Sequence, residues 1–563
     1  MRPHQGLPLA ITASAGLTAK VWGQAGVDFD PGYPVQDPTV SYWQIPTHPD
    51  VADGQSTTFP QTADVVIIGS GMSGTSVAWH LLVGDGHTAQ TPFKPRIAML
   101  EARQACSGAT GRNGGHIRPS SWEEYATAKR VTTKDEAIKI TRLRANHTQA
   151  IIAAAAKLSP EARRWSSARS VDSLDVFFDE VTFRHAVNAT EALKAEIPDV
   201  GEQWSVLEHD EAVRVSLIPT AVGALAGTPK LAGAVWGYRF VTSSLKYLLD
   251  GFPVSTDVVE ISRRGSFSLD TNTPARQVRA LPAGSEYNFE VVTDRGVIRT
   301  NHVVHASNAW VPHFTVGTGR FIDAMILHMS AQLGGTGLPN VGEWPPHYQN
   351  TSLPTGRAWS LFRNLGLDYV VHQPENNEFM FGGGAGLASV APPTATDPAL
   401  RYADNVTTMS PIYEAYLGGV LPTYFGYEAY GAERTDYPDN GTGSGIWPGR
   451  MKRVWNGVEA LTRDALPVVG PLDERFSNRT VLANPGKGRE WVTTGFNGEG
   501  MAYTWLSGKG LSEMIRNHGG RDNSSSDAVF EWFPRAFLLT EERLKRAAGV
   551  AVRDVQGLRR RSH

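Results

Sequence analysis

Three glycines follow a short apolar run at the spacing expected of a phosphate-binding turn. Residues 64–68 read DVVII, and Gly69, Gly71 and Gly74 come directly after them. In such a turn the first glycine permits a sharp bend, the second lets the backbone approach a pyrophosphate, and the third lets the next helix pack closely on the strand. The helix N-terminus then favours an anion through its unpaired N–H groups and its dipole. The spacing therefore predicts that these residues bind a phosphate-containing ligand.

The elements that position this turn form a strand–helix–strand unit. Residues 64–68 have the composition of a buried parallel strand, and residues 73–83 are apolar enough for a helix. Residues 96–100 predict a second strand ending at Glu101, whose carboxylate can accept hydrogen bonds from ribose hydroxyls. Glu101 lies 27 residues after Gly74, more than the usual spacing of about 20, because a polar loop precedes the second strand. This order favours a dinucleotide site over an ordinary strand–turn–helix.

Four further segments resemble those of one family and occur in its order. They read SGATGRNGGH at residues 107–116, VVHASNAW at 303–310, WNGVEALTRDALPVVG at 455–470 and TGFNGEGMAYTWLSGKGLSEMI at 494–515. Together with the glycine turn, they resemble the D-amino-acid oxidase superfamily of FAD-dependent oxidoreductases, over roughly residues 40–545. The PTVSYWQ segment at residues 38–44 is most similar to a fungal branch of FAD-dependent amine oxidases near the γ-glutamylputrescine oxidases.

The resemblance implies an α/β fold with two interleaved domains. One is a Rossmann-type FAD-binding domain, and the other is an α+β substrate domain built on a mainly antiparallel sheet. A chain of 563 residues is long enough for two such cores. The expected ranges are 1–60 for an N-terminal leader, 61–164, 231–319 and 451–525 for the FAD-binding domain, 165–230 and 320–450 for the substrate domain, and 526–563 for a C-terminal helical tail.

The resemblance also assigns the residues expected to contact FAD, which is expected to be bound non-covalently. Some relatives attach FAD through a Cys or a His, but their Cys sites lie in the C-terminal half, and their His positions correspond here to Gly111 or Arg112. The single cysteine, Cys106, lies beside the flavin loop and keeps a covalent link or a redox role open as the alternative. The expected contacts are Gly69, Gly71, Met72, Ser73, Gly74, Glu101, Ala102, Arg103, Gly108, Ala109, Thr110, Asn113, Gly114, Gly115, Asn308, Trp310, Asn497, Gly498, Glu499, Gly500 and Met501.

The resemblance implies hydride transfer from a C–H bond next to an amine nitrogen to the flavin N5 atom, after which water hydrolyses the imine. Reduced flavin also needs its negative charge stabilised at the N1 and C2=O end. The turn at residues 495–500 and the helix after it are expected to do this through N-terminal N–H groups. His116 is a candidate base or flavin-tuning residue, because histidine titrates near neutrality. Its alternative role is to satisfy backbone groups.

A second candidate residue, Glu459, bears on the substrate. In glycine and D-amino-acid oxidases, the segment that matches residues 455–470 carries an arginine that binds the substrate carboxylate through two hydrogen bonds. That position corresponds here to Glu459, which can instead attract an ammonium group or accept an N–H. We therefore expect an amine, a polyamine-like molecule or a natural-product intermediate rather than a simple α-amino acid. In the alternative, Glu459 points away and pairs with an arginine.

The sequence is also compatible with two other functions. The chain reads HMSAQ at residues 328–332 where family members usually read PVRGQ, so an arginine is missing. Six aromatic residues between positions 236 and 369 suit a roomy pocket for dehydrogenation or oxidative cyclisation of a larger secondary metabolite, although such residues are more often core. A non-catalytic FAD-fold module is the other alternative. The electron acceptor, O2 or another molecule, cannot be inferred, since Lys509 lies about three helical turns from Gly498. The aromatic residues in question are Trp236, Tyr238, Phe240, Trp359, Phe362 and Tyr369.

Composition excludes several classes of partner. The net charge of −3 and pI near 6.6 give no electrostatic case for nucleic acid, and the basic cluster at residues 559–561 is most simply a solvated tail. No run reaches the 18 or more apolar residues of a membrane span. No HExxH motif, paired-cysteine zinc pattern or G-x-S-x-G elbow is present, so neither a metal site nor a serine nucleophile is expected. A small-molecule substrate remains, and the sequence leaves the oligomeric state open.

The compartment is also left open between cytoplasmic and secreted or endomembrane. Residues 7–19 form a mildly apolar stretch after Arg2, as in a weak signal peptide. Seven N-x-S/T sequons favour secretion, whereas the weak apolar region and the intracellular habit of the relatives favour the cytoplasm. The sequons begin at Asn146, Asn188, Asn350, Asn405, Asn440, Asn478 and Asn523.

Overall fold

The computed structural model describes residues 29–84, 93–254, 264–347, 356–363, 366–384, 398–433, 449–518 and 527–547. Three of the sequence features considered above lie outside these ranges. They are the signal-like segment at residues 7–19, the basic cluster at residues 559–561, and the sequons at Asn350, Asn440 and Asn523.

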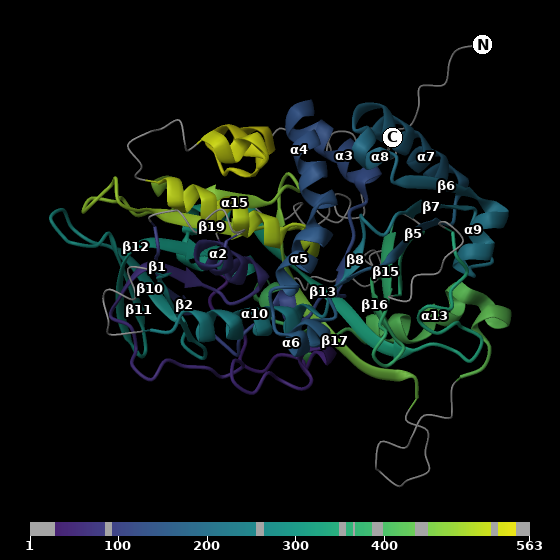
Figure 1. The fold of residues 1–563 in the computed structure, drawn as a ribbon, viewed down its shortest axis with the longest axis horizontal. Helices are drawn as coiled ribbons and strands as arrows, with labels where there is room; N and C mark the ends of the chain where they lie inside the picture. The colour runs from purple at the N-terminus through teal and green to yellow at the C-terminus, as the bar shows by residue number, and fades with distance from the viewer. Residues whose placement is uncertain are drawn as a thin grey trace, which may run out of the picture.

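The first sheet has a parallel core around the predicted strand–helix–strand unit (Figure 1). Its central strand, β1, pairs with β12 on one side and β2 on the other, and β2 pairs with β9. β1 is central because its apolar residues Val65, Val66 and Ile67 are fully buried. The parallel strands are β1 (Thr62–Ile68), β2 (Arg96–Leu100), β9 (Ser266–Asp270), β12 (Gly296–His305) and β19 (Glu490–Thr494).

Antiparallel strands extend this sheet at its edge. β10 (Ala275–Ala280) pairs with β11 (Phe289–Thr293), which pairs in turn with β12. The β11–β12 hairpin turns through the two residues Asp294 and Arg295, because Thr293 is paired with Gly296. β18 (Val468–Pro471) pairs with β19 beyond the parallel core.

Three helices pack next to one another beside the first sheet. α2 (Met72–Leu82) follows β1, and it packs against α10 (Gly237–Gly251) and α15 (Thr504–Asn517). Trp79 of α2 and Trp505 of α15 are both buried with their ring centroids 5.8 Å apart. These contacts bring the start of α15 against α2, the helix that follows the glycine turn.

The second sheet is mainly antiparallel, with the strand order β17-β13-β16-β15-β14-β5-β7-β6. Only the β14–β5 pair is parallel. This arrangement confirms the expected fold class. The strands are β5 (Asp172–Phe177), β6 (Trp204–Glu208), β7 (Gly223–Gly227), β13 (Ile322–Leu333), β14 (Arg357–Arg363), β15 (Gly366–His372), β16 (Glu378–Gly382) and β17 (Met451–Thr462).

The longest pairing of this sheet joins β13 and β17 in an antiparallel ladder. The expected domain ranges assign residues 451–525 to the FAD-binding domain, yet β17 hydrogen-bonds within the second sheet. The ladder also contacts the segment after β12, through the 3-10 helix η5 (Asn308–Trp310). The two domains therefore meet along β17, and the expected domain boundaries stay a prediction.

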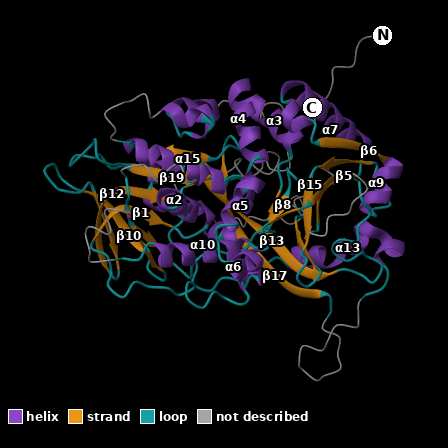
Figure 2. Cartoon of the chain, viewed as in Figure 1, coloured by secondary structure: helices purple, strands orange, loops and turns teal. Residues whose placement is uncertain are grey.

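Residues 121–166 form four helices in succession, α3 to α6. This stretch is interrupted by N-caps at Thr133 and Ser159, whose side chains accept backbone N–H groups. Figure 2 shows α4 and α5 between the strands of the two sheets. None of the helices in the described part of the chain is long and apolar enough to cross a membrane. The remaining principal helices are α3 (Ser121–Val131), α4 (Lys134–Ala145), α5 (His147–Ala155), α6 (Pro160–Ser166), α7 (Glu180–Glu196), α8 (Pro198–Gly201), α9 (His209–Ser216) and α13 (Pro411–Tyr430).

Candidate active site

Two adjoining cavities lie where the first sheet meets the β13–β17 ladder. The larger has an open volume of about 1190 Å³ and the smaller about 790 Å³. Five residues line both cavities, so the two share a wall. These are Ala109, Asn113, Glu459, Gly498 and Met501.

The glycine turn forms one wall of the larger cavity. Gly69 has a φ of +113°, and a Cβ atom there would lie 2.5 Å from the Ala306 carbonyl oxygen, so only glycine fits. Gly71 is the N-cap of α2 and carries no capping side chain. Gly74 does not line the cavity, because it faces the Gly69 carbonyl where α2 packs on the turn. The turn therefore opens the N-terminus of α2 to the cavity, as a phosphate would require.

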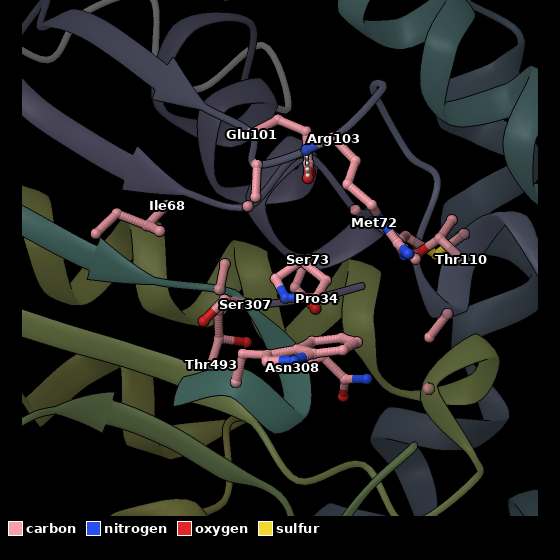
Figure 3. Close-up of a pocket in the computed structure, with 18 of the residues that line it drawn as sticks. Pro34, Ile68, Met72, Ser73, Glu101, Arg103, Thr110, Ser307, Asn308 and Thr493 are labelled. Atoms are coloured by element: carbon pink, nitrogen blue, oxygen red, sulfur yellow. Dashed lines mark hydrogen bonds between the residues drawn. The ribbon is translucent and has the colours of Figure 1, made fainter. Parts of the chain in front are cut away.

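Glu101 lies at the carboxyl end of β2 and lines the same cavity (Figure 3). Its Oε2 atom accepts hydrogen bonds from the Ser70 N–H at 3.1 Å and the Ser70 hydroxyl at 2.7 Å. Its Oε1 atom accepts the Arg103 N–H at 3.1 Å. These bonds fix the carboxylate at the place where the sequence predicts contact with ribose.

Four polar groups around the larger cavity have no hydrogen-bond partner in the described part of the chain. They are the hydroxyls of Ser307, Thr493 and Thr504 and the indole N–H of Trp310. Buried polar groups are normally hydrogen-bonded, so several unsatisfied ones around one cavity indicate a polar ligand. Figure 3 shows Ser307 and Thr493 together on the side opposite Glu101. The glycine turn, the acidic residue and these groups fit the expected FAD.

The loop at residues 107–116 connects the two cavities. Thr110 Oγ1 accepts the Met72 N–H at 2.9 Å, which attaches the loop to the first turn of α2. Asn113 Oδ1 accepts the Gly115 N–H at 2.7 Å, which shapes the loop itself. Gly114 lies against the Tyr369 ring, where a Cβ atom would clash. The loop can therefore pass closely between the larger cavity and the smaller one.

The turn at residues 495–500 lies across from this loop. Gly498 has a φ of +80° and lines both cavities. Asn497 is structural, since its Oδ1 atom accepts the Thr462 N–H at 2.8 Å and its Nδ2 donates to the Gly495 carbonyl at 2.7 Å. A 3-10 helix (Gly500–Ala502) follows, and α15 then begins at Thr504. The N–H groups of Asn497 and Glu499 donate to the carbonyls of Ala460 and Phe496 at 3.0 and 2.9 Å, so stabilisation of the reduced flavin by this turn stays a prediction.

Most of the predicted cofactor contacts come together around the larger cavity, although their roles remain predictions. Those that line it are Gly69, Gly71, Met72, Ser73, Glu101, Ala102, Arg103, Gly108, Ala109, Thr110, Asn113, Asn308, Trp310, Gly498, Gly500 and Met501. Gly114 and Glu499 line only the smaller cavity, and Gly74, Gly115 and Asn497 line neither. Sequence reasoning missed other residues of the larger cavity, chiefly Gly32, Tyr33, Pro34, Pro274, Ala275, Ser307, Thr493 and Thr504.

The smaller cavity is built on three strands of the second sheet. β13 contributes Leu327 and Met329, β15 contributes Tyr369, and β17 contributes Gly457 and Glu459. Leu327 is paired with Gly457 in the β13–β17 ladder, and Met329 lies two residues further along β13. Alternate residues of a strand point to the same face, so these side chains share one face of the sheet.

Glu459 is the one acidic side chain at this boundary with no hydrogen bond or ion pair in the described part of the chain. Burial alone raises the pKa of its carboxyl group to about 7. The alternative in which Glu459 turns away to pair with an arginine is therefore not observed. Its carboxyl group faces both cavities and is free to meet a ligand.

The arginines around the smaller cavity are already engaged. Arg118 donates to both carboxylate oxygens of Asp175, at 3.1 and 3.3 Å. Arg144 forms ion pairs with Glu499 and Glu124 behind the cavity wall. The Arg112 guanidinium donates to three backbone carbonyls and to the Thr39 hydroxyl, and it lies 3.2 Å from Asp404. None of these guanidinium groups is left open to bind a substrate carboxylate.

His116 also lines the smaller cavity. Its Nε2 atom has no hydrogen-bond partner among the described residues. Burial, with Arg118 nearby, lowers the pKa of the imidazole to about 3. His116 is therefore neutral at physiological pH and is a weak proton acceptor.

Two other candidates lie away from the cavities. Cys106 is only 1% exposed and lines neither cavity, and burial raises the pKa of its thiol further. Lys509 lines neither cavity, and its ammonium group lies 5.4 Å from the centroid of the Trp532 ring.

The aromatic residues considered for a roomy substrate pocket are mostly core. Of the six, only Tyr369 lines either of the two cavities described above. Trp236, Tyr238, Phe240 and Trp359 are at most 2% exposed, and Phe362 stacks on Phe177. The aromatic content of this region therefore reflects packing, and it gives no support to a large substrate.

Comparisons with known proteins agree with this geometry. A family model for FAD-dependent oxidoreductases, DAO, matches residues 64–514. A search of curated proteins finds no match. Among solved structures, an insertion-deleted L-amino acid deaminase from Proteus vulgaris is similar at 15% identity and a TM-score of 0.52, covering 84% of this chain and 94% of that one.

Two further structures share the fold. L-proline dehydrogenase from P. horikoshii is similar at 16% identity and a TM-score of 0.52, covering 85% of this chain and 98% of that one. An FAD-bound L-α-glycerophosphate oxidase from Mycoplasma pneumoniae is similar at 12% identity and a TM-score of 0.50, covering 81% and 94%. Since the family model spans most of the sequence, this chain belongs to the DAO family of FAD-dependent oxidoreductases.

Proposed function

We propose that the protein oxidises a carbon–nitrogen bond of a small, positively charged amine, with FAD as the electron acceptor. The observation that carries the proposal is Glu459, which faces both cavities without a partner in the described part of the chain. A buried carboxylate is stabilised by a nearby cation. An ammonium group bound in the smaller cavity would supply that cation at the edge of the cofactor cavity.

The chemistry follows from the protonation of the amine. A protonated amine must first lose a proton, because its nitrogen lone pair is needed to form the new double bond. Glu459, with a pKa near 7, can bind the ammonium group as a carboxylate and then accept this proton. FAD, when bound, supplies the acceptor for the hydrogen and the electron pair that leave the adjacent carbon. The carbon–nitrogen bond becomes a protonated imine, which water hydrolyses to a carbonyl compound and an amine.

The charges around the smaller cavity distinguish this substrate from an α-amino acid. The deaminase and the proline dehydrogenase named above act, by their names, on amino acids, which carry a carboxylate. Here Arg118 is paired with Asp175 and Arg144 with Glu499, so a substrate carboxylate would meet Glu459 without a free cation. Like charges in a poorly solvated site repel, which favours an amine that lacks a carboxylate.

Anaerobic reduction of the holoenzyme tests the proposal. The loss of flavin absorbance is followed after adding primary, secondary and diamine substrates, and separately after adding L- and D-α-amino acids. We expect at least one amine to bleach the flavin faster than every amino acid. Faster reduction by an amino acid than by any amine would refute the assignment. Admission of air, with detection of hydrogen peroxide, then distinguishes O2 from another electron acceptor.

A further inference from the structure

Part of the N-terminal leader lies in the wall of the larger cavity. Gly32, Tyr33 and Pro34 line it together with the glycine turn and Glu101. Figure 3 shows Pro34 among the side chains that surround the cavity. We call residues 30–39 the strap. A ligand that fills this cavity must contact the strap as well as the first sheet.

The N-terminal end of the strap, the first end, is attached to α12 (Val311–Phe314) and β10 beside the larger cavity. Asp30 Oδ1 lies 2.7 Å from His313 Nδ1, on α12, and also accepts the Gly32 N–H at 2.9 Å. The Tyr33 hydroxyl donates to the Arg276 carbonyl of β10 at 3.3 Å. The Tyr33 ring packs edge-on against His313 at 4.5 Å, and the Arg276 guanidinium lies 5.0 Å from its centroid.

The second end is held by a buried cluster of two arginines and one aspartate. Arg103 donates to the Val35 carbonyl at 3.0 Å and to both oxygens of Asp404 at 2.9 and 3.0 Å. Arg112 donates to the Thr39 carbonyl at 2.6 Å and to the Thr39 hydroxyl at 3.0 Å. The Thr39 N–H donates to the Asp404 carbonyl at 2.8 Å.

This cluster connects the strap to the cofactor loop itself. Arg103 follows β2 and lines the larger cavity, whereas Arg112 belongs to the loop at residues 107–116 and lines the smaller one. The side chains of Arg103, Arg112 and Asp404 are 7%, 1% and 1% exposed. Charge-assisted hydrogen bonds among buried groups are strong, so this end is the firmer anchor. The first end is partly exposed, and it is where the strap can detach.

We propose that the strap is a closing element of the FAD site, which retains the non-covalent cofactor and opens at the Asp30–Tyr33 end when FAD enters or leaves. The rate of FAD release then depends on contacts that touch neither the glycine turn nor the substrate cavity. The inference rests on FAD binding alone and is independent of the substrate proposed above.

The test compares FAD release from holoenzyme variants, followed by the fluorescence of free FAD after dilution. The double variant D30N/Y33A removes the first anchor. Since an ion pair and ring contacts are lost, we expect release at least about tenfold faster than in the wild type. The control is E191Q, which removes the exposed ion pair of Glu191 with Lys194 on α7 and touches no residue that contacts the strap. Its release rate should equal that of the wild type.

Release from D30N/Y33A at the wild-type rate would overturn the proposal. A second measurement uses the wild-type protein, so it tests the proposal even if the double variant fails to fold. Hydrogen exchange of the backbone amides in residues 30–39 is compared before and after FAD is added to the apoprotein. Closure of the strap on the cofactor predicts slower exchange in this segment, and unchanged exchange would refute it. Neither readout involves a substrate, so failure of the amine proposal would leave both outcomes interpretable.

Discussion

The Glu459 carboxylate lies close enough to Tyr369 to raise the pKa of its phenol, yet the Tyr369 hydroxyl lies 2.9 Å from Met329 Sδ and makes no hydrogen bond to Glu459. Burial is the larger cause of that shift and Glu459 is the second. A carboxylate beside a hydroxyl normally accepts its proton. The Glu459 carboxylate is thus left with its hydrogen-bonding capacity directed at the cavities.

Substitution of Glu459 tests its role as a proton acceptor. In E459Q we expect kcat/KM for the best amine to fall by about 10²–10⁴, the usual contribution of a general base. In the wild type kcat/KM should rise with pH and level off above pH 7, because the pKa of about 7 leaves Glu459 protonated below it. This rise of kcat/KM with pH, the acidic limb of the profile, should be absent in E459Q. Steady-state kinetics between pH 5 and 9 measure both effects.

Two variants serve as controls for this pH profile. E202Q changes an exposed glutamate at the end of α8, and it should leave kcat/KM unchanged. H116N removes the other candidate base, and it should keep the limb near pH 7, because the pKa of His116 is about 3. A limb that disappears in H116N and persists in E459Q would reverse the assignment.

Glu459 should also make the stability of the apoprotein depend on pH. Its pKa is raised from 4.5 to about 7 in the folded state, so folding favours the protonated form. The stability that this gives is complete below pH 4.5 and is lost as pH rises through 7. Gln does not titrate, so the free energy of unfolding of E459Q should rise relative to that of the wild type between pH 5 and 8. The expected difference is on the order of 2 kcal/mol after allowance for partial exposure. Thermal unfolding of both proteins at each pH measures this, and parallel curves would contradict it.

The glycine turn makes a prediction that separates folding from cofactor binding. In G69A, a residue with φ of +113° gains a Cβ atom 2.5 Å from the Ala306 oxygen, so the apoprotein should lose at least about 2 kcal/mol of stability. In G71A, φ is −68° and the nearest atom is Thr110 Oγ1 at 3.2 Å, so the fold should persist. The new methyl group faces the cofactor cavity and should weaken FAD binding at least about tenfold. Thermal unfolding and FAD titration distinguish the two, and unchanged FAD affinity in G71A would place the phosphate elsewhere.

The position of Cys106 makes a prediction about how FAD is held. Because its side chain is buried and lines neither cavity, acid precipitation should release all the flavin into the supernatant. C106A should behave in the same way. Yellow colour that stays in the wild-type pellet and leaves the C106A pellet would establish a thioether link at this residue.

The sequence predicts the residues of the larger cavity better than those of the smaller one, for a physical reason. Gly69, Gly71 and Glu101 belong to one local unit, in which turn geometry and strand composition are set by neighbouring residues. The loop containing Asn113 and the turn containing Gly498 were placed by resemblance, and both lie at the cavities.

Other features depend on contacts between distant segments. Tyr33 has no periodic pattern around it, so nothing local indicates that it lines the larger cavity. Whether Glu459 is paired depends on Arg118 and Arg144, which lie more than 300 residues earlier and are engaged by Asp175 and Glu499. Such pairings emerge only when the chain is folded, which is why both states of Glu459 stayed open from the sequence.

Side chains of β17 point alternately to the cavities and to the core, and this limits which substitutions the strand can accept during evolution. Gly457 and Glu459 face the cavities, whereas Val458 and Ala460, which alternate with them along the strand, are at most 1% exposed and pack in the core. Exchanges at Glu459 can therefore change the lining of the cavities without disturbing the packing of Val458 and Ala460, whereas a Cβ atom at Gly457 would lie 3.2 Å from Arg112 Cβ. Under the function proposed above, a change in the preferred amine would be expected to appear first as substitutions at the cavity-facing residues of this strand.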